Sequence, residues 1–260
     1  MSFNVRYDNP EDGDNAWENR KDLAAQIVTD YQADIVGTQE VLYKQLLDIA
    51  ARLPKYAYIG VGRGDGEKGG EFCAILYKKD VFSVVDSGTF WLSETPDRPG
   101  SKGWDAACER IGTWAILMHK KTKKKVFAIN THLDHVGKKA RREGVFVLLT
   151  KTRELSKGLP VILTGDFNAT PDSEPIQHIL SPGSPVVLVH TKDVAKEFDG
   201  SNWTFHSFGK VPFEDRVFID YIFVSPNIKV LQHTVLPDKL DGKYITDHSV
   251  VTALIQIPFK

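Results

Sequence analysis

The sequence predicts an α/β (α+β) protein in which two packed sheets are covered by helices. Three observations carry this prediction. Strands and helices alternate over residues 1–53, β-rich runs separated by turns fill the middle of the chain, and the mixed pattern returns after residue 138. No Pro-, Gly- or Ser-rich linker divides the sequence, so we expect a single domain over residues 1–260.

The N-terminal part is expected to run strand, helix, strand, helix. Residues 2–6 form the first short strand, and apolar residues at helical spacing over 23–31 predict an amphipathic helix. Residues 34–38 are apolar enough for a buried strand. A second helix is expected over 42–53, ended by Pro54.

The middle of the chain favours antiparallel hairpins. The glycine-rich segment 60–66 leads toward another strand instead of opening a helix, so it is a loop and not a dinucleotide-binding fingerprint. The lysine-rich segment 119–125 lies between two strands and is expected to be a solvated hairpin tip. The β-rich runs are residues 56–61, 72–78, 82–92, 112–119 and 125–131.

After residue 138 the chain mixes helices and strands again. A helix with four basic residues in its first turns precedes a buried strand over 161–164 and a short helix over 175–180. Further strands are expected near 217–224 and 249–257. The basic turns could steer a phosphate or form a plain solvated face, and the sequence leaves both readings open.

Composition excludes several classes of protein. The 33 Lys+Arg against 34 Asp+Glu give a net charge of −1, too little positive charge for a dedicated nucleic-acid coat protein. No transmembrane segment or leader is visible, so we expect a soluble chain, cytoplasmic or exported if a leader was removed. Cys73 and Cys108 are expected to be free, buried thiols.

Polar residues recur where the apolar strands end. Because residues i and i+2 of a strand share a face, Asp166 and Asn168 would point the same way. Four carboxylates gathered in one cleft would repel one another unless a cation were present. An oxygen-rich set without thiolates favours Mg²⁺ or Mn²⁺ over zinc. The strand-end residues are Asn4, Glu40, His132, Asp134, Asp166, Asn168, Asp220, Asp247 and His248.

Six short motifs, taken in order, resemble those of the endonuclease/exonuclease/phosphatase superfamily, the DNase I-like fold. The resemblance runs from residue 2 to about 255. It implies a four-layer sandwich, with two mixed sheets between helices, and Mg²⁺-dependent hydrolysis of phosphate esters. The motifs are Ser-Phe-Asn-Val-Arg at 2–6, Thr-Gln-Glu at 38–40, Asn-Thr-His at 130–132, Gly-Asp-Phe-Asn at 165–168, Ile-Asp-Tyr-Ile at 219–222 and Thr-Asp-His at 246–248.

The resemblance also implies a metal site. It makes Glu40 the principal ligand of Mg²⁺ or Mn²⁺, with Asn4 and Asp247 completing or supporting the site. A cation there would neutralise charge that develops during hydrolysis.

Five further residues receive catalytic roles from the resemblance. Asp166 would orient or deprotonate the attacking water, while Asn168 and His132 would hold phosphoryl oxygens. His248 would stabilise the charged transition state, oriented by Asp220.

Two residues are candidates for substrate binding. Arg110 resembles an arginine of a bacterial subgroup, and its planar fork suits a phosphate. His206 could line the cleft or be structural.

We therefore expect a metal-dependent hydrolase that acts on a phosphodiester or a phosphomonoester. Expected substrates are small phosphodiesters, sugar or lipid phosphates and nucleic acid ends, and no protein partner is implied. The alternatives are a nuclease specific for single-stranded DNA or RNA ends and, less favoured, a non-catalytic module that binds phosphorylated ligands. The complete set of acids and histidines argues against the last of these.

Overall fold

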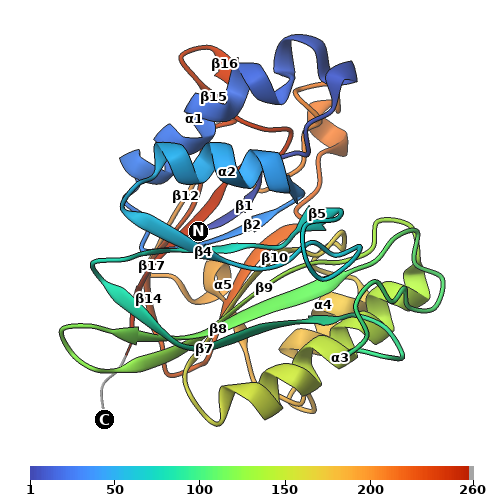
Figure 1. Ribbon diagram of the computed structural model, residues 1–260, viewed down its shortest axis with the longest axis vertical. Helices are drawn as coiled ribbons and strands as arrows, with labels where there is room; N and C mark the ends of the chain where they lie inside the picture. Colours follow the sequence, from blue (N-terminus) through green and yellow to red (C-terminus); the bar gives the residue numbers. More distant parts are fainter. Residues whose placement is uncertain (258–260) are drawn as a thin grey trace.

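The computed structural model describes residues 1–257, in which two large sheets pack face to face (Figure 1). The first sheet has the strand order β12-β14-β17-β1-β2-β6-β4. It is mixed, because β1 runs parallel to β2 and antiparallel to β17. Its strands are β1 (Ser2–Asn4), β2 (Ile35–Gln39), β4 (Tyr56–Ile59), β6 (Ile75–Lys78), β12 (Glu197–Asp199), β14 (Lys229–Val235) and β17 (Val251–Gln256).

The second sheet has the order β11-β13-β10-β9-β8-β7. It is also mixed, because β9 and β10 are parallel while the other neighbours are antiparallel. Its strands are β7 (Phe82–Trp91), β8 (Ile111–His119), β9 (Lys125–His132), β10 (Val161–Asp166), β11 (Val189–His190) and β13 (Asp220–Val224).

Helices cover the outer faces of both sheets. In Figure 1, α1 (Trp17–Asp30) and α2 (Tyr43–Arg52) lie over the first sheet, and α3 (Lys138–Ser156) and α4 (Glu174–Leu180) lie over the second. The expected four-layer sandwich is confirmed. The smaller elements are η1 (Pro10–Asn15), β3 (Val41–Leu42), β5 (Glu71–Phe72), α5 (Thr191–Val194), η2 (Phe213–Asp215), β15 (Lys239–Leu240) and β16 (Lys243–Tyr244). Within residues 1–257, no helix is both long and apolar enough to cross a bilayer.

Most predicted elements are present, and two differ for clear reasons. Helix α1 begins at Trp17, six residues before the expected start, and the fully buried Trp17 ring donates its Nε1 hydrogen to Asp48. Strand β14 was not expected from the sequence. His233 and Thr234, which point to opposite faces of the strand, are both buried, so β14 lacks the apolar alternation that marks a strand.

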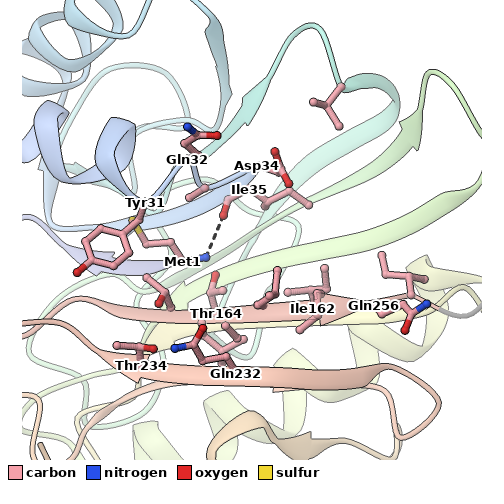
Figure 2. Close-up of a pocket in the computed structure, with 18 of the residues that line it drawn as sticks. Met1, Tyr31, Gln32, Asp34, Ile35, Ile162, Thr164, Gln232, Thr234 and Gln256 are labelled. Atoms are coloured by element: carbon pink, nitrogen blue, oxygen red, sulfur yellow. Dashed lines mark hydrogen bonds between the residues drawn. The ribbon is translucent and has the colours of Figure 1, made fainter. Parts of the chain in front are cut away.

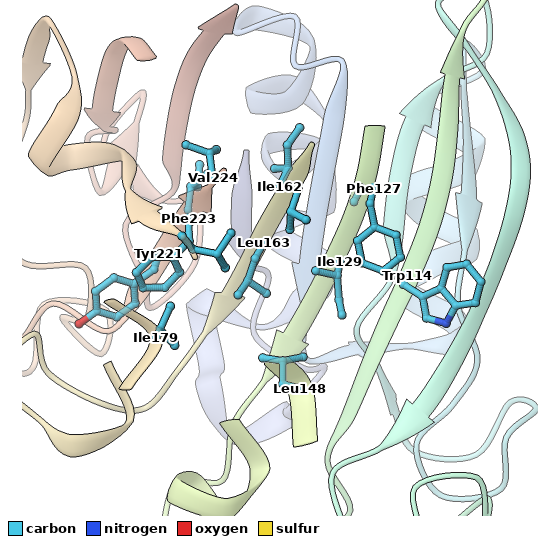
Figure 3. Close-up of a cluster of buried hydrophobic side chains, with 14 of the residues drawn as sticks. Trp114, Phe127, Ile129, Leu148, Ile162, Leu163, Ile179, Tyr221, Phe223 and Val224 are labelled. Atoms are coloured by element: carbon cyan, nitrogen blue, oxygen red, sulfur yellow. The ribbon is translucent and has the colours of Figure 1, made fainter. Parts of the chain in front are cut away.

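An aromatic and aliphatic core fills the space around the second sheet (Figure 3). Trp114 of β8 and Phe127 of β9 are stacked, with ring centroids 5.7 Å apart. Leu148 of α3 and Ile179 of α4 are fully buried and belong to the same cluster. The burial of these side chains anchors the helices to the sheet.

A buried hydrogen-bond network joins the two sheets. Gln39 Nε2 of the first sheet and Thr164 Oγ1 of the second both donate to Asn130 Oδ1, at 2.7 and 3.0 Å. Asn130 Nδ2 in turn donates to the carbonyl oxygens of Thr38 and Ala74, at 2.8 and 3.1 Å. Asn130, on β9, thus uses both ends of its amide to hold the first sheet in register with the second.

The sheets approach closely at this network because of Gly37. A Cβ atom at that position of β2 would overlap Thr164 Oγ1 and lie 2.5 Å from Asn130 Oδ1. Glycine therefore leaves the space that the bridging amide occupies.

A cavity of about 640 Å³ lies between the sheets beside Met1. Figure 2 shows Met1, Ile35, Ile162 and Thr164 on its walls. The Met1 amino group donates to the carbonyl of Ile35 at 3.0 Å, and burial lowers its pKa to about 5. Among the described residues that line this cavity there is none of the strand-end acids, amides and histidines, so it is distinct from the candidate site.

Two histidines are buried beside β13 and β14. The rings of His190 and His233 lie 5.5 Å apart, and His233 Nδ1 pairs with Thr191 Oγ1 at 2.8 Å. Burial, and then the nearby His190 and Lys192, lower the pKa of His233 to about 3. The folded protein therefore holds His233 neutral.

Replacement of Asn130 by Ala is expected to lower the free energy of unfolding by about 2–4 kcal/mol, because it leaves several buried polar groups unpaired. Urea denaturation of the variant measures this loss. Replacement of the exposed Asn227 by Ala is the matched control. Equal stability of the two variants would contradict a bridging role for Asn130.

Acidification is expected to weaken the fold through His233. Its pKa is 6.5 when unfolded and about 3 when folded, so between these values protons bind mainly the unfolded chain and stability falls with falling pH. The contribution of His233 is a loss of about 2 kcal/mol between about pH 7.5 and about pH 5. Urea denaturation of wild type and His233→Leu at both pH values measures this loss. On acidification, the wild type should lose about 2 kcal/mol more than the variant. A difference independent of pH would overturn the assignment.

Candidate active site

A second cavity, of about 750 Å³, collects most of the residues named from the sequence. It includes seven of the ten candidates: Glu40, Arg110, His132, Asp166, Asn168, Asp247 and His248. Asn4 and Asp220 hydrogen-bond to these residues without lining the cavity themselves. His206 does not reach the cavity. This cavity is therefore the candidate active site.

Strand register brings the candidates together. The parallel pairing of β9 with β10 sets Asp166 beside His132, and the antiparallel pairing of β10 with β13 sets Asp166 beside Asp220. In the other sheet, Asn4 of β1 lies beside Gln39, one residue before Glu40. The cavity is thus assembled from strand ends of both sheets.

The Asn4 amide separates two carboxylates. Its Nδ2 atom donates to Glu40 Oε1 and to Asp166 Oδ2, both at 3.0 Å, and lies 3.4 Å from His248 Nε2. Its Oδ1 atom accepts the backbone N–H of Arg6 at 2.9 Å. Asn4 therefore fixes the spacing of the acidic cluster.

Glu40, His132 and Asp166 form a group that could hold a metal ion. Each offers a ligand atom, and these atoms lie within 4.8 Å of one another. Two of the three ligands are carboxylates, which suit a hard cation such as Mg²⁺ or Mn²⁺. The donor chemistry therefore fits the ion expected from the sequence.

The acids of the site are strained electrostatically. Burial and then the negative charge of Asp220 raise the pKa of Asp166 to about 7, although His248 opposes the rise. Burial also raises the pKa of Asp247; His248 opposes this rise and Glu40 adds to it. A divalent cation would relieve this repulsion and keep the acids ionised.

His248 is held by Asp220. Its Nδ1 atom lies 2.8 Å from Asp220 Oδ2, and its Nε2 atom lies 3.8 Å from Asp166 Oδ2. Burial lowers the pKa of His248, but Asp220 and then Asp166 and Asp247 raise it well above the usual range. The ring is therefore an oriented imidazolium that faces the acidic cluster.

His132 differs from His248 in charge. Burial, and then the positive charges of Arg110 and Arg63, hold its pKa well below the usual value, so the ring is neutral. Its Nε2 atom lies 3.0 Å from Asn168 Nδ2, which also donates to the carbonyl of Leu133. These contacts fix the Asn168 amide at the cavity wall.

Five residues of the cavity have left-handed backbone angles. The φ values are 59° at Arg6, 62° at Glu40, 46° at Asn168, 50° at Ser207 and 54° at Phe208. Non-glycine residues adopt this conformation at a cost.

Arg110 lies on the cavity wall, and among the described residues one of its donors is unpaired. It is 5 % exposed; its Nε donates to Asp134 Oδ2 at 3.3 Å, and its Nη2 lies 2.9 Å from His135 Nδ1. Within residues 1–257, its buried Nη1 has no hydrogen-bond partner. Such a donor is costly unless a ligand accepts its hydrogens.

His206 does not line the cleft, which was one of the two roles that the sequence left open for it. The ring is fully buried, stacks on Tyr244 and accepts the N–H of Gly209, so it supports a loop instead of lining the cleft.

Other cavity residues were not singled out from the sequence. Among them are His135, Arg63, which lies in the glycine-rich loop, and Glu71, which follows that loop. Only the position of His135 directly after the strand-end Asp134 could have indicated it.

Solved structures match this chain over nearly its full length. The endonuclease/exonuclease/phosphatase from Bacteroides vulgatus is 42 % identical, with a TM-score of 0.95, over 99 % of this chain and 97 % of that one. The mannosyl-6-phosphatase Bt3783 of Bacteroides thetaiotaomicron is 39 % identical, with a TM-score of 0.91, over 98 % of each chain.

Curated relatives are more distant and longer. Nocturnin of Drosophila melanogaster is 24 % identical over 245 residues, which is 81 % of this chain and 36 % of that protein. The chain thus spans about a third of the length of this relative. The model of the Endonuclease/Exonuclease/phosphatase family matches residues 1–248, and its relatives include phosphatases and nucleases. With this match and the site described above, the chain belongs to that family and is a phosphate ester hydrolase.

Proposed function

We propose that this chain is a metal-dependent phosphatase that removes phosphate from phosphorylated carbohydrates. The observation that carries this proposal is the near-full-length likeness to a mannosyl-6-phosphatase. A phosphodiesterase or nuclease is the alternative within the same chemistry.

The charges of the cavity favour a compact monoester over a nucleic acid. Each of three arginines on its wall is paired with a carboxylate, so no continuous positive track is available for a phosphate backbone. The pairs are Arg6–Asp12, Arg63–Glu71 and Arg110–Asp134.

Glu40 would hold the Mg²⁺ or Mn²⁺ ion, because it belongs both to the set expected from the sequence, with Asn4 and Asp247, and to the group whose ligand atoms converge in the structure, with His132 and Asp166. When bound, the ion supplies positive charge that offsets the negative charge of the phosphoryl group. Asn4, already bonded to Glu40, keeps that carboxylate in place.

Asp166 accepts the proton of the water that attacks phosphorus. Its buried carboxylate accepts the N–H of Asn168 on Oδ1 at 2.9 Å, while Oδ2 accepts from Asn4 at 3.0 Å and lies 3.8 Å from His248 Nε2. The attacking water oxygen bonds to phosphorus as the bond to the alcohol oxygen breaks, and the departing oxygen takes its proton from the imidazolium of His248.

Donors around the site hold the phosphoryl oxygens. Arg110, whose Nη1 has no partner among the described residues, is the charged donor for this group. Asn168 also lies on the cavity wall, with its Nδ2 atom already directed at His132 and at the carbonyl of Leu133. The imidazolium of His248, fixed by Asp220, stabilises the charge that builds up as the bond breaks.

Wild-type enzyme is expected to hydrolyse mannose 6-phosphate faster than bis-p-nitrophenyl phosphate, with Mg²⁺ or Mn²⁺ required and EDTA abolishing turnover. Asp166→Ala should lower kcat by about 10²- to 10⁴-fold, because the proton acceptor is lost. Phosphate release measures both effects. The exposed Asp97→Ala variant is the control. Preference for the diester would replace the phosphatase with a phosphodiesterase.

Metal binding is tested separately by calorimetry with Mn²⁺. Glu40→Gln should weaken binding at least about tenfold, because it removes a charged ligand. Equal binding by wild type and variant would exclude Glu40 as a ligand.

Asp220→Asn is expected to lower kcat and to move the alkaline limb of its pH profile to lower pH. Asp220 raises the pKa of His248, so without it the imidazolium loses its proton earlier as pH rises. A pH–rate profile of the variant checks the direction. An unmoved alkaline limb would contradict the role of His248 as an acid.

A further inference from the structure

A half-buried ion pair lines the active-site cavity outside the catalytic cluster. Arg63 Nη1 and Nη2 donate to Glu71 Oε2 and Oε1, both at 2.7 Å. The side chains are 14 % and 18 % exposed, and both line the 750 Å³ cavity. Their exposed atoms therefore face the space where a substrate binds.

The surrounding backbone holds this pair rigidly. The N–H of Arg63 donates to the carbonyl of Glu71 at 3.0 Å, and Trp91 Nε1 donates to the carbonyl of Arg63 at 2.7 Å. Glu71 lies on β5, opposite Leu42 of β3, two residues after Glu40. The pair is thus fixed relative to the catalytic acids before any ligand arrives, and β5 lies at the same end of the sandwich in Figure 1.

The chemistry of the pair suits hydroxyl groups. Each carboxylate oxygen that accepts one N–H keeps a further lone pair, and the guanidinium keeps further N–H donors. A hydroxyl both donates and accepts, so neighbouring hydroxyls of a sugar match both partners. The pair has no net charge, so it offers little attraction to a second phosphate.

Because both side chains line the cavity, this pair can do more than close the loop. An ion pair that only closed the loop would gain nothing from facing a polar cavity. Burial raises the pKa of Glu71, and Arg63 opposes this rise. Hydroxyl groups of a ligand in the cavity can reach both side chains.

We propose that Arg63 and Glu71 form the subsite that binds the hydroxyl groups of the sugar from which phosphate is removed. This inference rests on the proposed phosphatase function. It makes the pair a determinant of specificity for the leaving alcohol, separate from the groups that hold the phosphate.

The test compares mannose 6-phosphate with hexyl phosphate. Both are monoesters of primary alcohols, so the chemical step is alike, and only the first carries ring hydroxyls. Glu71→Gln and Arg63→Met should lower the ratio of kcat/KM for mannose 6-phosphate to that for hexyl phosphate by about ten- to one-hundredfold, mainly through KM. Glu71→Gln preserves size and serves if Arg63→Met does not fold, as judged by thermal denaturation.

Arg52→Met is the matched control, because it removes an exposed arginine–carboxylate pair with Asp22 that does not line the cavity. Its substrate ratio should equal that of wild type. An unchanged ratio in Glu71→Gln, or an equal loss on both substrates, would overturn the subsite. The phosphatase proposal is tested independently of the subsite. It fails if the wild-type enzyme prefers bis-p-nitrophenyl phosphate to either monoester.

Discussion

The amide of Asn130 is the contact on which the active site most depends. It accepts from Gln39 and Thr164 and donates to two carbonyls of the first sheet, so it joins the sheets in one register. A buried polar network of this kind is favourable only when all its members are satisfied, and it then specifies one arrangement. Glu40 follows Gln39 directly, and His132 follows Asn130 by two residues. The same contact therefore fixes the distance between a carboxylate from one sheet and a histidine from the other.

Charge is distributed around the cavity so that a cation and an anion can both be accommodated. Glu40, Asp166 and Asp247 converge, and burial raises the pKa of Asp166 and of Asp247. The two histidines take opposite states, with His248 charged beside Asp220 and His132 neutral beside the arginines. Pairs of titratable groups whose surroundings drive their pKa values apart are typical of catalytic sites. Here the two pKa values differ because His248 lies beside carboxylates and His132 lies beside arginines.

The order of the short motifs in the sequence predicted most of the fold and most of the site. Strand ends could be identified from apolar runs, and the family resemblance supplied the pairing of distant segments, so seven cavity residues were named in advance. His206 could not be resolved, because an aromatic-rich segment is compatible with both a cleft wall and a packed loop. Arg63 and Glu71 were missed since their meeting depends on how a glycine-rich loop folds back, which no local pattern specifies. Strand β14 was missed because buried His233 broke the apolar alternation.

The left-handed angles at Arg6, Glu40 and Asn168 have a consequence for how this chain can change over time. Glycine adopts such angles without penalty, whereas other residues lose about 1–3 kcal/mol at each position. A lineage or a laboratory library selected only for robust folding would therefore drift toward glycine at these three positions. Its protein would become more stable and at the same time lose its catalytic activity. Retention of bulky polar side chains there is a signature of continued selection for turnover.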